Sequence, residues 1–124
     1  FNKLKLLDGA HYEIENENSQ LIISPWGSSK GPSREAYERL LDDNYDIGWI
    51  YSVALNPIPE EVFEALKKSK CVLVPELNYQ GQWSSLLRQD GIKAQSIIKY
   101  DGTPFRPGEL VKEITRIFDK ERKK

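Results

Sequence analysis

The sequence contains few of the residues that hold metals or carry redox chemistry. Cys71 is its single cysteine, His11 is its single histidine, and methionine is absent. One cysteine allows no internal disulfide and cannot by itself ligate an iron–sulfur cluster or a structural zinc. We therefore expect this chain to hold no metal. Because methionine is missing even at position 1, we also expect the chain to be part of a longer polypeptide.

Long apolar runs and an excess of one charge are absent as well. No run approaches the ~18 apolar residues of a membrane span, and the start of the chain lacks the layout of a signal peptide. The 18 basic and 19 acidic side chains leave a net charge of -1, which gives no general attraction to nucleic acid or anionic lipid. We expect a single soluble, cytoplasmic domain with one core, no nucleic-acid partner and no membrane partner.

Apolar segments of two kinds alternate along the chain. Four β-rich runs, each followed by apolar residues at helical spacing, lie at 20–24, 46–53, 70–74 and 92–99. Pro32, Pro59 and Pro107 stand near the expected helix starts, where a missing N–H costs nothing. Asn44 and Gly91 fall where left-handed C-terminal caps are expected. This order predicts a three-layer α/β/α fold with a mostly parallel sheet of about five strands.

The first nineteen residues follow a different pattern. HYEIE at 11–15 alternates apolar and polar residues, as a half-exposed strand does, and NENS at 16–19 is typical of a turn. We expect an antiparallel edge strand here, within an N-terminal extension over 1–19 that precedes an α/β domain over 20–124. The charged run DKERKK at 119–124 is expected to continue the last helix into solvent.

Ligands and partners of open α/β sheets meet the loops that follow the carboxyl ends of the strands. The first such loop, at 24–31, combines small residues with Lys30 before a helix start, which favours an anion, although neither nucleotide-binding glycine motif is complete. A plain hydrophilic turn and a surface that packs on a neighbouring domain are the alternative interpretations. A second loop, at 74–83, gathers amides, a carboxylate and two aromatic residues around Gly81. A third, at 99–105, is a turn.

Catalytic residue sets are missing from these loops. His11 lies on the expected edge strand without a serine or cysteine nucleophile pattern around it. Cys71 opens an apolar strand and is expected to be a small core residue. The adjacent carboxylates at 42–43 and 60–61 are surface neighbours rather than an acid–base couple. We therefore nominate no catalytic residue.

Four loop motifs follow one another in a specific order: WGSSKG at 26–31, LNPIP at 55–59, PELNYQGQ at 75–82 and KYDGTPF at 99–105. Together they resemble the C-terminal domain of the alpha subunit of 2-oxoacid:ferredoxin oxidoreductases, the family of the pyruvate and 2-oxoglutarate enzymes. The resemblance runs from about residue 20 to the end, and the first eighteen residues match poorly. Ile58 departs from the pattern, because the family usually has an aromatic residue between the two prolines.

The resemblance implies a fold like the transketolase C-terminal domain, with a five-stranded mixed sheet in which one strand is antiparallel. It also implies a complete enzyme that decarboxylates a 2-oxoacid with thiamine diphosphate, passes electrons through an iron–sulfur cluster to ferredoxin, and transfers the acyl group to coenzyme A. In that family the cofactor lies between an upstream pyrimidine-binding domain and the beta subunit. This chain is therefore expected to bind no cofactor and to be inactive alone.

A non-catalytic role in domain and subunit assembly follows from the resemblance, with the strand-end loops as the contact surface. The candidate binding or interface residues are Trp26, Gly27, Ser28, Ser29, Lys30, Gly31, Glu76, Asn78, Tyr79, Gly81, Gln82 and Asp101. The alternative is a free-standing flavodoxin-like module, in which the loop at 27–31 holds a phosphate-bearing small molecule and Tyr79 stacks on its ring.

Overall fold

The computed structural model describes residues 5–7, 10–25, 29–52, 59–77, 82–99 and 103–122. In chain order they form β1 (Lys5–Leu7), β2 (Ala10–Glu15), β3 (Leu21–Ile23), α1 (Lys30–Asp42), β4 (Ile47–Ser52), α2 (Glu60–Lys68), β5 (Val72–Leu77), α3 (Gln82–Gln89), β6 (Ala94–Lys99) and α4 (Pro107–Arg122). From β3 onward, strands and helices alternate as the sequence predicts.

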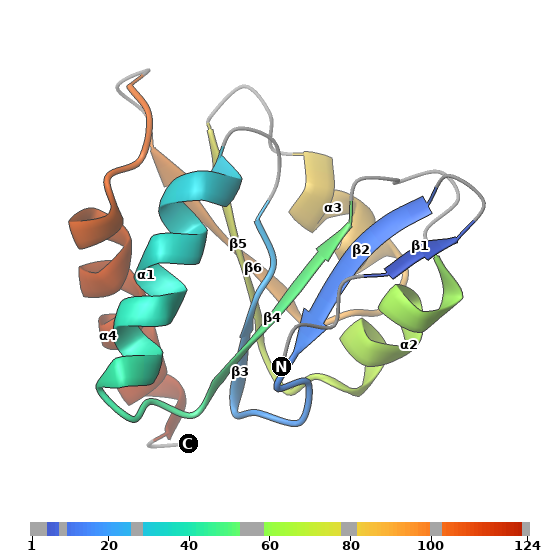
Figure 1. The fold of residues 1–124 in the computed structure, drawn as a ribbon, viewed down its shortest axis with the longest axis horizontal. Helices are drawn as coiled ribbons and strands as arrows, with labels where there is room; N and C mark the ends of the chain where they lie inside the picture. Colours follow the sequence, from blue (N-terminus) through green and yellow to red (C-terminus); the bar gives the residue numbers. More distant parts are fainter. Residues whose placement is uncertain are drawn as a thin grey trace.

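The strands form one mixed sheet in the order β1-β2-β4-β3-β5-β6. The neighbouring strands β4, β3, β5 and β6 pair in parallel. Strand β2 pairs antiparallel with β4, and β1 pairs antiparallel with β2. Helices α1 and α4 cover one face of the sheet, and α2 and α3 cover the other (Figure 1). The predicted α/β/α architecture with an antiparallel N-terminal strand is confirmed. The described sheet has one strand more than expected, because β1 lies outside β2.

The central strands bury side chains on both faces. In β5, Leu73 packs into the cluster beneath α1 and α4, while Val72 and Val74 pack into the cluster beneath α2 and α3. Full burial of such a side chain contributes about 1.5–3 kcal/mol. Because both faces are covered, the run reads as continuously apolar rather than alternating. Cys71 is buried in the first cluster, as the sequence predicts.

The N-terminal segment shares this sheet and its cores. Tyr12 and Ile14 of β2 are buried on the side of α2. After β2 the chain turns at Asn16, whose carbonyl accepts hydrogen bonds from the backbone N–H of Ser19 at 3.2 Å and from its hydroxyl at 2.7 Å. The predicted strand and turn are confirmed, but the predicted edge position is wrong, because β2 pairs with β1 on one side and with β4 on the other. A domain boundary at residue 19 stays a prediction.

The helix ends follow the sequence signals. Asn44 (φ 66°) and Gly91 (φ 81°) take the left-handed conformation after α1 and α3. Pro59 precedes α2, and Pro107 is the first residue of α4. In α4, the Glu109 carboxylate accepts the backbone N–H of Arg106 at 2.8 Å, which satisfies a donor that the helix start leaves unpaired.

Strand β5 is longer than the sequence predicted, and this corrects the loop assignment for 74–77. All six residues of β5 pair with β6. Alternate residues of β5 face β3, because the carbonyls of Cys71 and Leu73 accept hydrogen bonds from that side. Pro75 is the next residue in this alternation and has no N–H to donate. Since β3 ends before it reaches Pro75, no hydrogen bond of the sheet is lost there. Glu76 is therefore a strand residue and not a loop residue.

Gly48 of β4 provides a test of this packing. A Cβ at this position would meet the carbonyl oxygen of Asn16 at 2.2 Å and Cδ1 of Ile22 at 2.6 Å. Because one contact is backbone, Gly48→Ala should lower the free energy of unfolding by about 1–3 kcal/mol, measured by urea denaturation. Gly108→Ala is the matched control, since its Cβ would meet nothing within 4 Å and alanine favours the helix. An equal decrease in the free energy of unfolding in both variants would contradict this packing.

Candidate functional site

The described candidate residues lie toward the carboxyl ends of neighbouring strands. Lys30 and Gly31 begin α1, Ser29 immediately precedes it, and Gln82 is the first residue of α3. Because β3 and β5 are parallel neighbours, the start of α1 and the end of β5 lie at the same edge of the sheet. The other candidates lie outside the described residues: Trp26, Gly27, Ser28, Asn78, Tyr79, Gly81 and Asp101.

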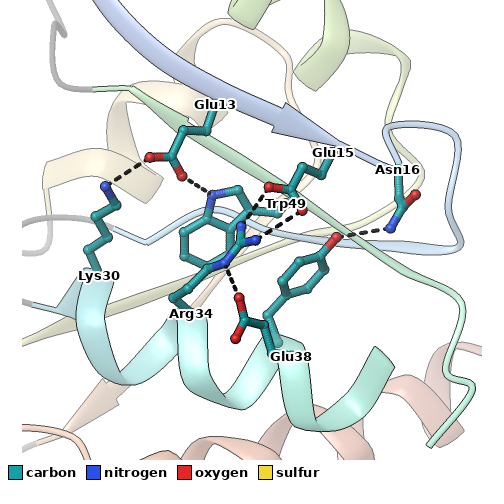
Figure 2. Close-up of polar contacts among 8 residues, drawn as sticks. Glu13, Glu15, Asn16, Lys30, Arg34, Glu38 and Trp49 are labelled. Carbon is teal, nitrogen blue, oxygen red and sulfur yellow. Dashed lines mark hydrogen bonds and ion pairs between the residues drawn. The ribbon is translucent and has the colours of Figure 1, made fainter. Parts of the chain in front are cut away.

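Lys30 contacts β2 within the same chain. Its Nζ lies 3.0 Å from Oε2 of Glu13 and 4.3 Å from the centre of the Tyr51 ring. The other carboxylate oxygen of Glu13 accepts a hydrogen bond of 2.8 Å from Nε1 of Trp49. Figure 2 shows that this single carboxylate joins β2, β4 and the start of α1.

One turn further along α1, Arg34 makes a second connection to β2. Its guanidinium donates to both carboxylate oxygens of Glu15, at 2.8 and 3.2 Å, and its Nε donates to Glu38 at 2.8 Å (Figure 2). The guanidinium carbon also lies 5.1 Å from the ring centres of Tyr37 and Trp49. Because the contacts combine a bidentate pair with ring faces, lysine would not replace this arginine.

Burial and these contacts shift the pKa values of the network. Burial raises the pKa of Glu13, but hydrogen bonds from Lys30 and Trp49 outweigh it and leave that pKa below its ordinary value. Burial, with the nearby charge of Glu15, raises the pKa of Tyr37 to about 12. At neutral pH Glu13 is therefore charged and Tyr37 is protonated. That state suits a structural connection better than general acid–base catalysis.

Two serine hydroxyls in and just before the first turns of α1 make no hydrogen bond to any residue that the structure describes. Ser29 and Ser33 are both buried, and Ser29 does not cap the helix with its side chain. A helix start favours an anion, which is the basis of the anion site predicted at 27–31. The charge of Lys30, however, is engaged by Glu13. An anion site at 27–31 stays a prediction.

Glu76 is fully buried on the α2 and α3 side of β5. Its Oε2 accepts a hydrogen bond of 3.1 Å from the hydroxyl of Ser96 in the neighbouring strand β6. A buried carboxylate needs such partners, because taking it out of water is costly. This contact is made within the sheet, and the place of Glu76 in an interface stays a prediction.

Sequence reasoning missed the network on β2 and α1, although a signal for it exists. The alternation in HYEIE puts Glu13 and Glu15 on one face of a strand, about 6.7 Å apart. Lys30 and Arg34 are four residues apart on a helix, which places them about 6 Å apart on one side. The two spacings match. What the sequence does not give is that this strand and this helix are neighbours.

Other classes of site find no support in the described part of the chain. No described helix is long and apolar enough to cross a membrane. Within the described residues, histidine, cysteine and carboxylate side chains form no group of three that would hold a metal ion.

Several curated proteins are similar to this chain, although no protein-family profile matches it. It is 32% identical over 110 residues to the 2-oxoglutarate oxidoreductase subunit KorA of Mycobacterium tuberculosis, covering 84% of this chain and 17% of that protein. It is 30% identical over 107 residues to the alpha subunit of 2-oxoacid:ferredoxin oxidoreductase 1 of Aeropyrum pernix, covering 82% and 17%. It is 29% identical over 106 residues to the 2-oxoglutarate synthase subunit KorA of Methanocaldococcus jannaschii, covering 83% and 28%. The chain thus spans well under a third of these relatives.

A solved structure agrees with these relatives. The 2-oxoglutarate:ferredoxin oxidoreductase from Magnetococcus marinus, with 2-oxoglutarate, coenzyme A and succinyl-CoA bound, superposes with a TM-score of 0.73 at 28% identity. The match covers 95% of this chain and 20% of that one. It therefore includes most of the first nineteen residues, which the sequence motifs did not connect with the family.

Acidification tests the contribution of Glu13. Because the pKa of Glu13 is lower in the folded chain than the ordinary 4.5, its stabilisation is present above that pH and is lost as the pH falls through the folded value. Glu13→Gln should lower the free energy of unfolding by about 1–3 kcal/mol at about pH 7, and by clearly less at about pH 3. Urea denaturation at the two pH values measures the difference.

The control for this experiment is Glu113→Gln, which breaks a solvent-exposed pair with Arg116 on α4. Its effect should stay within about 0.5 kcal/mol at neutral pH. A Glu13→Gln deficit of equal size at both pH values would contradict the role assigned to its charge.

Proposed function

We propose that this chain, which belongs to the alpha-subunit family of 2-oxoacid:ferredoxin oxidoreductases, is the non-catalytic C-terminal domain of such a subunit and serves domain and subunit assembly. The proposal rests on the unequal shares of the two chains that each alignment covers. Nearly the whole chain aligns, but only with a small part of each relative. The rest of each relative has the length for the catalytic and cofactor-binding domains.

The proposed parent enzyme oxidatively decarboxylates a 2-oxoacid to an acyl-coenzyme A, in the cytoplasm, and reduces ferredoxin. Thiamine diphosphate would lie between the upstream pyrimidine-binding domain and the beta subunit. An iron–sulfur cluster does not fit the described residues, because Cys71 is alone and buried in the core. Coenzyme A is bound in the Magnetococcus relative, and other parts of the parent enzyme would hold it here.

The chemistry of residues 78–82 supports a contact role for them. Asn78 and Gln82 carry amides, which make hydrogen bonds without charge, and Tyr79 offers aromatic contact area. This mixture is typical of interfaces between domains. Lys30 is a further candidate for this junction, but its charge is engaged by Glu13. Tyr79 and Gln82 are therefore the residues to test.

Replacing both Tyr79 and Gln82 by alanine in the alpha subunit should weaken its assembly with the beta subunit at least about tenfold, because interface energy is concentrated in few residues. Native mass spectrometry and sedimentation measure the assembled fraction. The matched control replaces Gln89 and Gln95 by alanine, two exposed amide residues of α3 and β6. Unchanged assembly and unchanged turnover in the Tyr79→Ala, Gln82→Ala variant would refute the assembly role.

The unpartnered hydroxyls of Ser29 and Ser33 are the one observation that favours the alternative, a free-standing module that binds a phosphate-bearing molecule. Isothermal titration of the chain alone with flavin mononucleotide and with coenzyme A separates the two proposals. The assembly role predicts no heat of binding at micromolar concentrations of either ligand. Micromolar binding of either ligand would support the free-standing module instead.

A further inference from the structure

A cavity of about 450 Å³ lies between β2 and α2, on the opposite face of the sheet from Lys30 and Arg34. Figure 1 shows β2 and α2 side by side at this end of the molecule. The polar residues that line the cavity come from β2, from the turn after it and from α2, and they are Tyr12, Glu17, Glu60, Glu61, Glu64 and Lys68. Ile14 and Ala65 supply apolar lining. The assembly role of the chain does not make use of this cavity.

The lining carries four carboxylates against one ammonium group. Lys68 lies 3.9 Å from Glu17. Among the side chains that the structure describes, no cation lies within ion-pair distance of the other three carboxylates. The positive end of α2 accounts for Glu60 and Glu61 in its first turn, but this effect fades within one turn and does not extend to Glu64. Like charges three and four residues apart on a helix repel one another, so the cluster favours a cation.

The hydroxyl of Tyr12 is the second feature of this cavity. Tyr12 is 2% exposed, and its hydroxyl makes no hydrogen bond of normal length to any described residue, although the Glu61 carboxylate lies close enough to interact with it. Buried hydroxyls without a partner are rare in folded proteins. Burial raises the pKa of Tyr12, and the charge of the nearby Glu61 raises it further, so the phenol is protonated at neutral pH. Its oxygen can accept a hydrogen bond while its proton turns toward Glu61.

We propose that this cavity binds a guanidinium or primary ammonium group, which donates hydrogen bonds to the phenol oxygen of Tyr12 and to the carboxylates of Glu61 and Glu64. A cation of this kind balances the negative charge of the carboxylates and donates a hydrogen bond to the Tyr12 hydroxyl. The apolar lining from Ile14 and Ala65 suits the methylene stem that carries such a group. This inference holds for the chain alone and does not rest on its role in assembly.

Two sources supply the same chemistry: a small organic cation, or the arginine or lysine side chain of a neighbouring protein. Agmatine is the probe for the first source. An acetylated and amidated Gly-Ser-Arg-Ser-Gly peptide is the probe for the second. N-butylurea, which is similar in shape to a guanidinium but uncharged, is the control ligand. Titration of the isotope-labelled chain, followed by the amide shifts of β2 and α2 in NMR spectra, gives the dissociation constants.

Agmatine or the peptide should bind, and N-butylurea should not. Replacing both Glu61 and Glu64 by glutamine should weaken binding at least about tenfold, because charge-assisted hydrogen bonds are lost. Asp42→Asn, which removes one exposed charge from α1, should leave the dissociation constant unchanged. Tighter binding of agmatine indicates a small-molecule site, and tighter binding of the peptide indicates a docked side chain. Both outcomes support the proposal.

Tyr12→Phe separates a binding role from a structural one. Removing an unpartnered hydroxyl should leave the melting temperature equal or higher, while the affinity for the cation falls about three- to tenfold. No shift with either cationic probe would overturn the proposal. Equal binding of N-butylurea, or an equal effect of Asp42→Asn, would overturn it as well, because either would show attraction that does not depend on this cavity.

Discussion

The Glu13 carboxylate is the contact on which the N-terminal half of the structure depends. It accepts hydrogen bonds from Lys30 at the start of α1 and from Trp49 in β4, and it belongs to β2 itself. Three elements from distant parts of the sequence therefore meet at one charged group. Hydrogen bonds to charged, mostly buried groups contribute about 1.5–3 kcal/mol each, whereas exposed ion pairs contribute close to nothing. These hydrogen bonds therefore add to the apolar packing that holds α1 over this side of the sheet.

Strand β2 has separate roles on its two faces, because side chains alternate along a strand. Glu13 and Glu15 point toward α1 and carry the ion pairs. Tyr12 and Ile14 point toward α2, where they are buried and line the acidic cavity. The strand that connects the N-terminal segment to the rest of the chain therefore also forms a wall of the proposed cation site. The antiparallel pairing of β2 with β4 sets which residue of β4 lies opposite each of these four residues.

The sequence predicts those features that depend on residues close together in the chain. The alternation of strands and helices, the left-handed residues Asn44 and Gly91, and the burial of Cys71 are all confirmed. The end of β5 was predicted wrongly, because Pro75 suggests a loop unless one knows that β3 stops before it. The three residues of β1 are too few to form a pattern. The ion-pair network requires knowledge of which strand lies beside α1, and a single sequence does not contain it.

In the candidate site, too, the sequence predicts some features and does not show others. Loop motifs identified the family, because the order and chemistry of short segments are visible in a sequence. The contacts of the candidate residues were not visible. Lys30 pairs with a strand that the sequence left as an extension, and Glu76 lies inside the sheet. The residues proposed to make assembly contacts are therefore fewer than the sequence suggested, although they remain at the carboxyl ends of the strands.

Lysine acylation footprinting of the chain alone and of the assembled enzyme shows whether the carboxyl ends of the strands face a neighbouring domain or subunit. Lys30 and Lys99 lie at that edge of the sheet, whereas Lys70 and Lys93 precede β5 and β6 at the opposite edge. If they do, assembly should lower the acylation rate of Lys30 and Lys99 several-fold and leave the rates of Lys70 and Lys93 unchanged. Protection of Lys70 and Lys93 alone, or of none of the four, would contradict it.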